Sequence, residues 1–418
     1  MLAMLGRFAV LIPVLGAVAL PASTAAAATQ SARPVAAAPR SVVVVAVPGL
    51  QWSNVTAADT PQLWSFAQTA ARGVLSVKTA HGTATCSAAM ATLGAGNRAI
   101  GTPAMDRFCA NPDATPPPAA DWTALLHANR GQLFGTQPGA LGAALGNAGL
   151  SVRALGAGGA ALAVAGPAGT IARATAPLAT LTVVEAAELY DVAPPARRAA
   201  AHAVDNAVTP WLDLARTGSL VFVVGAGDSP HGPAGLRVAL VRGAGFESGR
   251  LTSDSTGRTP YLELIDVAPT ILTALQVDVP TSMAGQPMRV SSRSSFAGDM
   301  HDFLDRSKHA RQRGHYGGLI VRIVVSTAAA ACLAGGAVLY FASRRRRLNN
   351  AVEMLCYVAS ALPFATYVLD GMPWWRWSMA VVIAIIAAID LVVAAMAYAA
   401  ARRVPRPRAP VDRPRCAP

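Results

Sequence analysis

Two cysteines, Cys86 and Cys109, are the only thiols in residues 1–313 and the first side chains whose chemistry the sequence constrains. The chain contains no Cys-x-x-Cys pair, which argues against a metal cluster or a dithiol redox centre. In an oxidising compartment the two thiols are expected to pair, and a disulfide closing a loop of this length stabilises a fold by about 3 kcal/mol. We therefore predict a Cys86–Cys109 disulfide.

A single carboxylate, Asp390, lies near the middle of an apolar stretch over residues 379–401. A charge at the centre of a bilayer costs roughly 2.5 kcal/mol or more, so such a residue needs a reason. It could be a proton or ion site. It could instead be a structural carboxyl group that is protonated or paired with Arg322 or Thr366. The structural interpretation is favoured, because a transporter normally has more than three spans.

Three apolar segments cover residues 319–342, 351–369 and 379–401, each about the length that crosses a bilayer. Arginine clusters at residues 344–347 and 402–403 follow the first and the third segment. A tryptophan-rich turn at residues 373–377 separates the second from the third. Arginine marks cytoplasmic ends and tryptophan marks membrane interfaces, so we predict three transmembrane helices with a cytoplasmic carboxyl terminus.

The amino terminus has the pattern of an export signal over residues 1–28. Arg7 precedes an apolar run at residues 8–20 and a run of small residues at 23–28. An uncleaved anchor helix is the alternative. Residues 29–40 are rich in Ala, Pro and Ser and are predicted to form a linker. Either interpretation places residues 41–313 outside the cytoplasm, in agreement with the arginine clusters.

The excess of positive charge belongs to the membrane part of the chain. The formal net charge is +13, of which residues 344–347 supply four and residues 402–418 supply six arginines less one aspartate. Both stretches follow apolar runs, which indicates a lipid bilayer as partner and argues against nucleic acid. With 53% hydrophobic and 14% charged residues, the chain is too apolar for a disordered polymer or an ordinary soluble enzyme.

Residues 41–313 alternate short apolar runs with amphipathic stretches, which predicts an α/β domain with a mostly parallel sheet flanked by helices. The β-branched run at residues 42–47 is typical of a strand buried on both faces. Further strands are expected at residues 152–155, 220–224 and 236–241. Helices are expected at residues 61–71, 138–148, 199–215 and 261–275. The Gly- and Ala-rich residues 156–169 have no pattern that assigns them a structure.

Several short motifs occur in the order found in the alkaline phosphatase and sulfatase superfamily. The early ones are Val42–Val47 with Pro48-Gly49, then Thr85-Cys86-Ser87 and Gly94-Ala95-Gly96-Asn97. The late ones are Arg237-Val238-Ala239-Leu240-Val241 and Leu264-Ile265-Asp266-Val267-Ala268-Pro269-Thr270. Residues 41–289 thus resemble that superfamily, which implies an alkaline-phosphatase-like fold. With the Pro-Trp-Trp-Arg motif, the whole chain also resembles a group of actinobacterial membrane proteins.

The resemblance implies hydrolysis of phosphate or sulfate esters by a hydroxyl or modified cysteine nucleophile beside one or two divalent metals. The nucleophile position falls on Thr85, and the late metal-binding motif falls on Asp228 and His231. The chain departs from the pattern in two places. Pro48 stands where the first ligand is an aspartate, and Asp228 and His231 are three residues apart instead of adjacent. His81 could reach the same cleft.

Each of these residues also has a structural interpretation. Thr85 could cap a helix, since Ser and Thr favour such positions. Asp228, followed by Ser229 and Pro230, could form a loop turn. Asp266 is expected to support its helix and not to bind a metal.

The sequence therefore favours a membrane-tethered extracytoplasmic domain that has lost its metal site, with a binding or structural role at the cell envelope. An envelope protein or a glycan would be its partner besides the bilayer, and no cofactor is expected. A metal-dependent phosphoester or sulfate-ester hydrolase using a divalent metal is the first alternative. A small membrane carrier or regulator using Asp390 is the second.

Overall fold

A computed structural model describes residues 39–403, apart from residues 83, 114, 172–178, 187–188, 190–191, 193, 229–234 and 342–345. The predicted export signal, nearly all of the predicted linker, most of the basic tail and His231 therefore lie outside the described residues.

A mixed, mostly parallel sheet forms the centre of the α/β domain, in the strand order β3-β4-β1-β5-β6-β2-β7-β9, with β8 beside β2. Strands β3, β4, β1 and β5 run parallel, and β6 is antiparallel to both of its neighbours. The bounds are β1 Val42–Ala46, β2 Ala71–Ser76, β3 Val152–Gly156, β4 Leu181–Glu185, β5 Leu220–Val224, β6 Leu236–Arg242, β7 Gly249–Thr252, β8 Tyr261–Glu263 and β9 Arg289–Ser292. The predicted fold class and all four predicted strands are confirmed.

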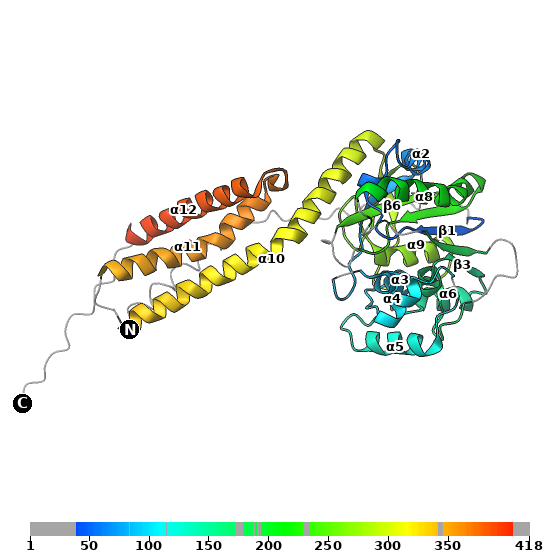
Figure 1. The fold of residues 1–418 in the computed structure, drawn as a ribbon, viewed down its shortest axis with the longest axis horizontal. Coiled ribbons are helices and arrows are strands. Elements are labelled where there is room, and N and C mark those ends of the chain that lie inside the picture. Colours follow the sequence, from blue (N-terminus) through cyan, green and yellow to red (C-terminus); the bar gives the residue numbers. More distant parts are fainter. Residues whose placement is uncertain are drawn as a thin grey trace, which may run out of the picture. The chain divides into compact units, whose positions relative to one another are not determined.

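Helices cover both faces of this sheet, and every side chain of β1 is therefore buried. Val42 and Val44 belong to one hydrophobic core, and Val43 and Val45 belong to the other. The first core includes residues of α3, α6, α7 and α9, and the second includes residues of α2, α8 and α10 (Figure 1). The bounds are α2 Pro61–Thr69, α3 Cys86–Ala95, α4 Pro103–Cys109, α5 Ala119–Arg130, α6 Ala140–Asn147, α7 Gly158–Val164, α8 Pro194–Leu212 and α9 Val267–Ala274.

The helix predicted at residues 61–71 ends two residues early and is followed directly by a strand. Helix α2 ends at Thr69, and Gly73 lies inside strand β2. A Cβ atom at this position would lie 2.9 Å from the carbonyl oxygen of Pro260. The glycine therefore permits the close approach of the chain that leads into β8.

The helix predicted at residues 261–275 begins later than expected. Residues Tyr261–Glu263 form β8, which pairs in parallel with β2, and a 3-10 turn at Leu264–Asp266 precedes α9. The elements that were not predicted are strands β2, β4, β7, β8 and β9 and helices α3, α4, α5 and α7. Helix α7 is built largely of Gly and Ala, which have no hydrophobic periodicity to reveal it.

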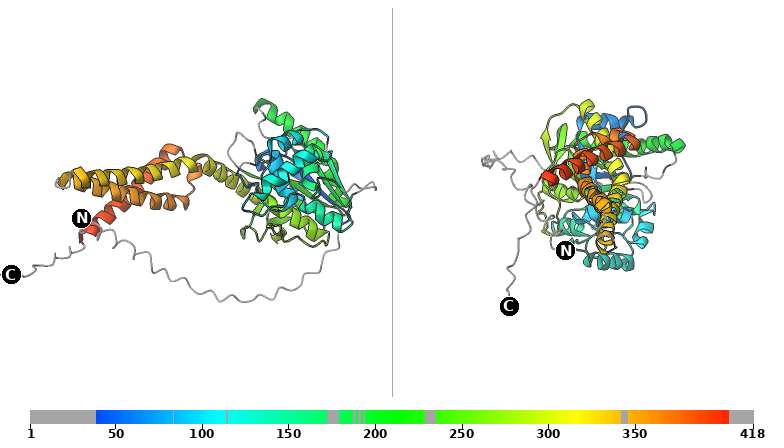
Figure 2. Two further views of the ribbon diagram at one scale, coloured as in Figure 1. Left: turned by 90° about the horizontal axis from the view of Figure 1, so that it is seen from below. Right: turned by 90° about the vertical axis from the view of Figure 1, so that its left-hand side faces the viewer.

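Three helices are long and apolar enough to cross a membrane: α10 Phe296–Phe341, α11 Arg346–Asp370 and α12 Met379–Arg403. Helix α10 differs from the expected segment because it begins 23 residues before position 319. Figure 2 shows it as one continuous helix. The predicted domain boundary at residue 313 therefore falls inside a helix.

Candidate functional site

The carboxyl ends of β1, β4 and β5 lie side by side at one edge of the sheet, where Ala46 pairs with Glu185 and with Val224. Ligands of open α/β sheets bind at such edges. Asp228 follows β5, and its backbone N–H donates to the carbonyl oxygen of Ala84 at 2.8 Å. The structure thus brings Asp228 to the segment that carries Thr85.

Thr85 is the N-cap of α3. Its hydroxyl oxygen accepts from the backbone N–H of Ala88 at 3.4 Å, and the residue is half-buried. This geometry corresponds to the helix-cap interpretation of Thr85. No contact of the described residues assigns it a role as a nucleophile.

Asp228 forms a buried ion pair with Arg237, a residue that the sequence analysis did not single out as part of the site. The Nε of Arg237 donates to Asp228 Oδ1 at 2.9 Å, and its Nη2 donates to the same oxygen. The exposed fractions are 4% for Asp228 and 2% for Arg237. Burial raises the pKa of Asp228, and Arg237 opposes that shift. The loop-turn interpretation of Asp228 therefore misses its main interaction.

Arg237 also reaches the other strand end that the resemblance marks as metal-binding. Its Nη1 donates to the carbonyl oxygen of Gly49 at 3.1 Å, directly after Pro48. Gly225 provides the space, since a Cβ there would lie 2.8 Å from the Cβ of Arg237. The sequence signal was a cation near the start of β6, directly before four apolar residues that are typical of a buried strand.

A second buried carboxylate, Glu185, ends strand β4 at the same edge and is 6% exposed. Its Oε2 accepts from the backbone N–H of Ala160 at 3.1 Å, and its Oε1 lies 3.4 Å from the Sγ of Cys86. A Cβ on Gly159 would lie 2.4 Å from Oε2. The sequence analysis missed Glu185 because it did not predict the strand.

The predicted disulfide joins Cys86 at the start of α3 to Cys109 at the end of α4, with 6.2 Å between the Cα atoms. It therefore ties the residue next to Thr85 to a second helix. Asp106 of α4 reinforces this link, because its Oδ1 accepts from the backbone N–H of Ser87 at 3.0 Å.

The described part of the site does not fit a divalent metal. Among the described residues, no three His, Cys, Asp or Glu side chains gather as a ligand set. Pro48 offers no side-chain donor, Asp228 is bound by Arg237, and His81 is exposed. His231 lies outside the described residues.

Asp390 in α12 is 5% exposed, and its Oδ1 has no hydrogen-bond partner among the described residues. The two partners considered from the sequence bond elsewhere. Arg322 Nε donates to the carbonyl oxygen of Gly318 at 3.3 Å, and the Thr366 hydroxyl donates to that of Pro363 at 2.8 Å. The pairing interpretations are thus not realised in the described structure.

No protein-family model and no curated protein matches this chain. Among solved structures, two crystal structures of Ps i-CgsB, one in complex with k-i-k-neocarrahexaose, align with a TM-score of 0.31 and 10% identity. They cover 60% of this chain and 75% and 74% of theirs. Murine ectonucleotide pyrophosphatase/phosphodiesterase 5 aligns with a TM-score of 0.28 and 9% identity, covering 63% of this chain and 100% of its own. These likenesses are too distant to assign an activity.

Proposed function

We propose that this protein is a membrane-tethered domain whose alkaline-phosphatase-like site is non-catalytic, and that it has a binding or structural role at the cell envelope. The observation that carries the proposal is the buried Arg237, which binds Asp228 and the backbone of Gly49 together. These are the two strand ends at which the superfamily resemblance places metal ligands.

A guanidinium ion can supply the charge of a metal at this place but not its chemistry. It is positive at all relevant pH values and satisfies a carboxylate through hydrogen bonds. It has no open coordination position, so it cannot bind a hydroxyl group and lower the pKa of that group as a metal does. A divalent cation would also be repelled by the buried positive charge. The pair therefore supports a site that keeps its fold without metal-assisted hydrolysis.

The three long apolar helices support the tether. Helix α10 is the first of them, and its amino-terminal residues Met300 and Phe303 belong to the hydrophobic core of the α/β domain. The placement of the domain outside the cytoplasm rests on the export signal and the arginine clusters of the sequence.

The full chain, purified in detergent, tests the proposal when it is supplied with zinc, manganese, magnesium or calcium. Phosphomonoesters, phosphodiesters and sulfate esters serve as substrates. We expect the turnover of the native protein to be no higher than that of Thr85→Ala. Thr123→Ala, at an exposed position of α5, is the matched control. Metal-dependent turnover that disappears in Thr85→Ala and persists in Thr123→Ala would establish the hydrolase instead.

The alternative of a small carrier or regulator is favoured by one observation, the buried Oδ1 of Asp390 without a described partner. Proton or cation flux into liposomes that contain the protein, abolished in Asp390→Asn, would support that alternative. Without such flux, Asp390 is a structural carboxyl group.

A further inference from the structure

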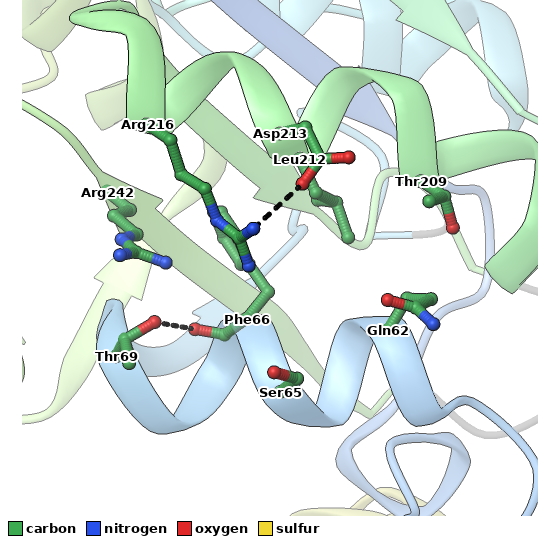
Figure 3. A pocket seen from close by; sticks show the side chains of 9 residues that line it. All are labelled: Gln62, Ser65, Phe66, Thr69, Thr209, Leu212, Asp213, Arg216 and Arg242. Atoms are coloured by element: carbon green, nitrogen blue, oxygen red, sulfur yellow. Dashed lines mark hydrogen bonds and ion pairs between the residues drawn. The ribbon is translucent and has the colours of Figure 1, made fainter.

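A small polar pocket with a cavity volume of about 130 Å³ lies between α2, the end of α8 with the 3-10 helix Asp213–Thr217 that follows it, and the end of β6. Its lining residues are Gln62, Ser65, Phe66, Thr69, Thr209, Leu212, Asp213, Arg216 and Arg242 (Figure 3). Arg242 pairs with Val221 at the start of β5, whereas Asp228 follows the end of that strand. The pocket and the candidate site therefore lie at opposite edges of the sheet.

The side chains that line the pocket carry a net positive charge. Two arginines and one aspartate line it, which leaves a formal charge of +1. Arg216 pairs with Asp213 at 3.7 Å, a long contact between mostly exposed side chains that contributes little. Figure 3 shows Arg216 and Arg242 at the same end of the pocket, near Thr69.

Arg242 is the unusual member of this group. It is half-buried, and among the described residues no carboxylate forms an ion pair with it. Arginine presents its N–H donors in a planar fork that matches the oxygen atoms of phosphate, sulfate or carboxylate groups. An anion between the two guanidinium groups would supply the missing acceptors.

The remaining polar groups favour an oxyanion with several acceptor oxygens. The hydroxyl of Ser65 and the side-chain amide of Gln62 are exposed and have no hydrogen-bond partner among the described residues, and both lie on the α2 side of the pocket. Ligand sites for drug-sized molecules enclose about 300–1,000 Å³, so this pocket admits one small group. A single phosphate or sulfate group fits these limits.

We propose that the pocket at Arg216 and Arg242 binds the phosphate or sulfate group of a small anion or of a larger envelope molecule. This inference is independent of the non-catalytic site, because the two places share no residue. It gives the domain a binding surface of defined chemistry.

The test uses the full chain in detergent, titrated calorimetrically with inorganic phosphate, sulfate and acetate at constant ionic strength. We expect saturable binding of phosphate or sulfate that weakens roughly tenfold or more in Arg242→Gln, since bonds to a charged group are the stronger ones. Arg258→Gln removes the same charge from an exposed position and should bind like the native protein. Thr85→Ala should also bind normally, which separates this pocket from the candidate site.

Arg242→Lys guards against a folding defect, because it retains the charge and loses the fork. We expect binding between that of the native protein and that of Arg242→Gln. Equal weakening in Arg242→Gln and Arg258→Gln, absence of saturable binding, or binding of acetate alone would overturn the proposal. Titration with glycerol 3-phosphate distinguishes a free anion from a phosphate group on a larger molecule. If glycerol 3-phosphate binds more tightly than inorganic phosphate, the ligand is a larger phosphorylated molecule. If the two bind equally, the ligand is the free anion.

Discussion

At the residue scale, the buried pair of Asp228 and Arg237 controls which charges the candidate site can accept. A buried pair of this kind is costly to separate, because removing one partner leaves an uncompensated charge in a poorly solvated place. Arg237 is further held by the carbonyl oxygen of Gly49. The arginine is therefore a structural component of the strand ends and not a surface residue that could move aside for a metal.

We predict that Arg237→Ala lowers the free energy of unfolding by about 3–5 kcal/mol at neutral pH. The double variant Arg237→Ala/Asp228→Asn should recover part of this loss, since it removes the charge that is left unpaired. Denaturant titration of the full chain in detergent measures both. A double variant that is no more stable than Arg237→Ala would show that packing of the arginine, and not its charge, carries the effect.

The pH dependence of the same variant follows from the direction of the Asp228 shift. Burial raises the pKa of this carboxyl even with Arg237 beside it. The folded state thus holds the proton more tightly than the unfolded chain, and this group's contribution to stability falls as pH rises through the folded pKa. Without Arg237 the pKa rises further, so the loss in Arg237→Ala should shrink as pH falls toward about 4.

At the scale of elements, α10 belongs both to the domain and to the membrane part. Its first turns carry Asp299, which is 1% exposed. The two carboxylate oxygens of Asp299 bind Arg72 of β2 at 2.5 Å and Arg250 of β7 at 2.6 Å. Phe303, one turn further on, is fully buried and packs on Trp52 with 4.8 Å between the ring centres. The start of the helix is therefore part of the second hydrophobic core.

We predict that Asp299→Asn lowers the free energy of unfolding by about 3–5 kcal/mol, because Arg72 is fully buried and would lose its counter-ion. Asp302→Asn is the matched control in the same helix. Its carboxylate is 27% exposed, so the loss should stay near or below about 1 kcal/mol. Thermal or denaturant unfolding compares the two, and equal losses would contradict a special role for the buried ion pair.

At the scale of the whole molecule, the orientation in the membrane decides which side the candidate site and the anion pocket face. The sequence predicts residues 41–313 outside and the carboxyl terminus in the cytoplasm. The three apolar helices are compatible with this topology.

We predict that a membrane-impermeant maleimide labels a cysteine introduced at the exposed position Arg258 in intact cells. The natural Cys416 of the tail should react only after the cells are permeabilised. Labelling in permeabilised cells is the control that both thiols can react with the maleimide. Labelling of Cys416 in intact cells without labelling at position 258 would reverse the topology.

The sequence by itself determined the features that depend on neighbouring residues. An uninterrupted β-branched run marks β1, and long apolar runs mark the three carboxyl-terminal helices, because local periodicity and length suffice to identify such elements. The Cys86–Cys109 disulfide also followed from the sequence, because these are the only two thiols in the first 313 residues and the export signal predicts an oxidising compartment.

Only the tertiary structure decided the contacts between distant parts of the chain. Arg72 and Asp299 are 227 positions apart, and nothing in their local sequences indicates that they meet. Glu185 acquires its place in the site from the parallel pairing of β1 with β4, and Arg237 acquires its place from the antiparallel pairing of β6 with β5. Buried charges choose partners by proximity in the fold, since an unpaired charge is costly there. That choice needs the register of the sheet, which no single stretch of sequence specifies.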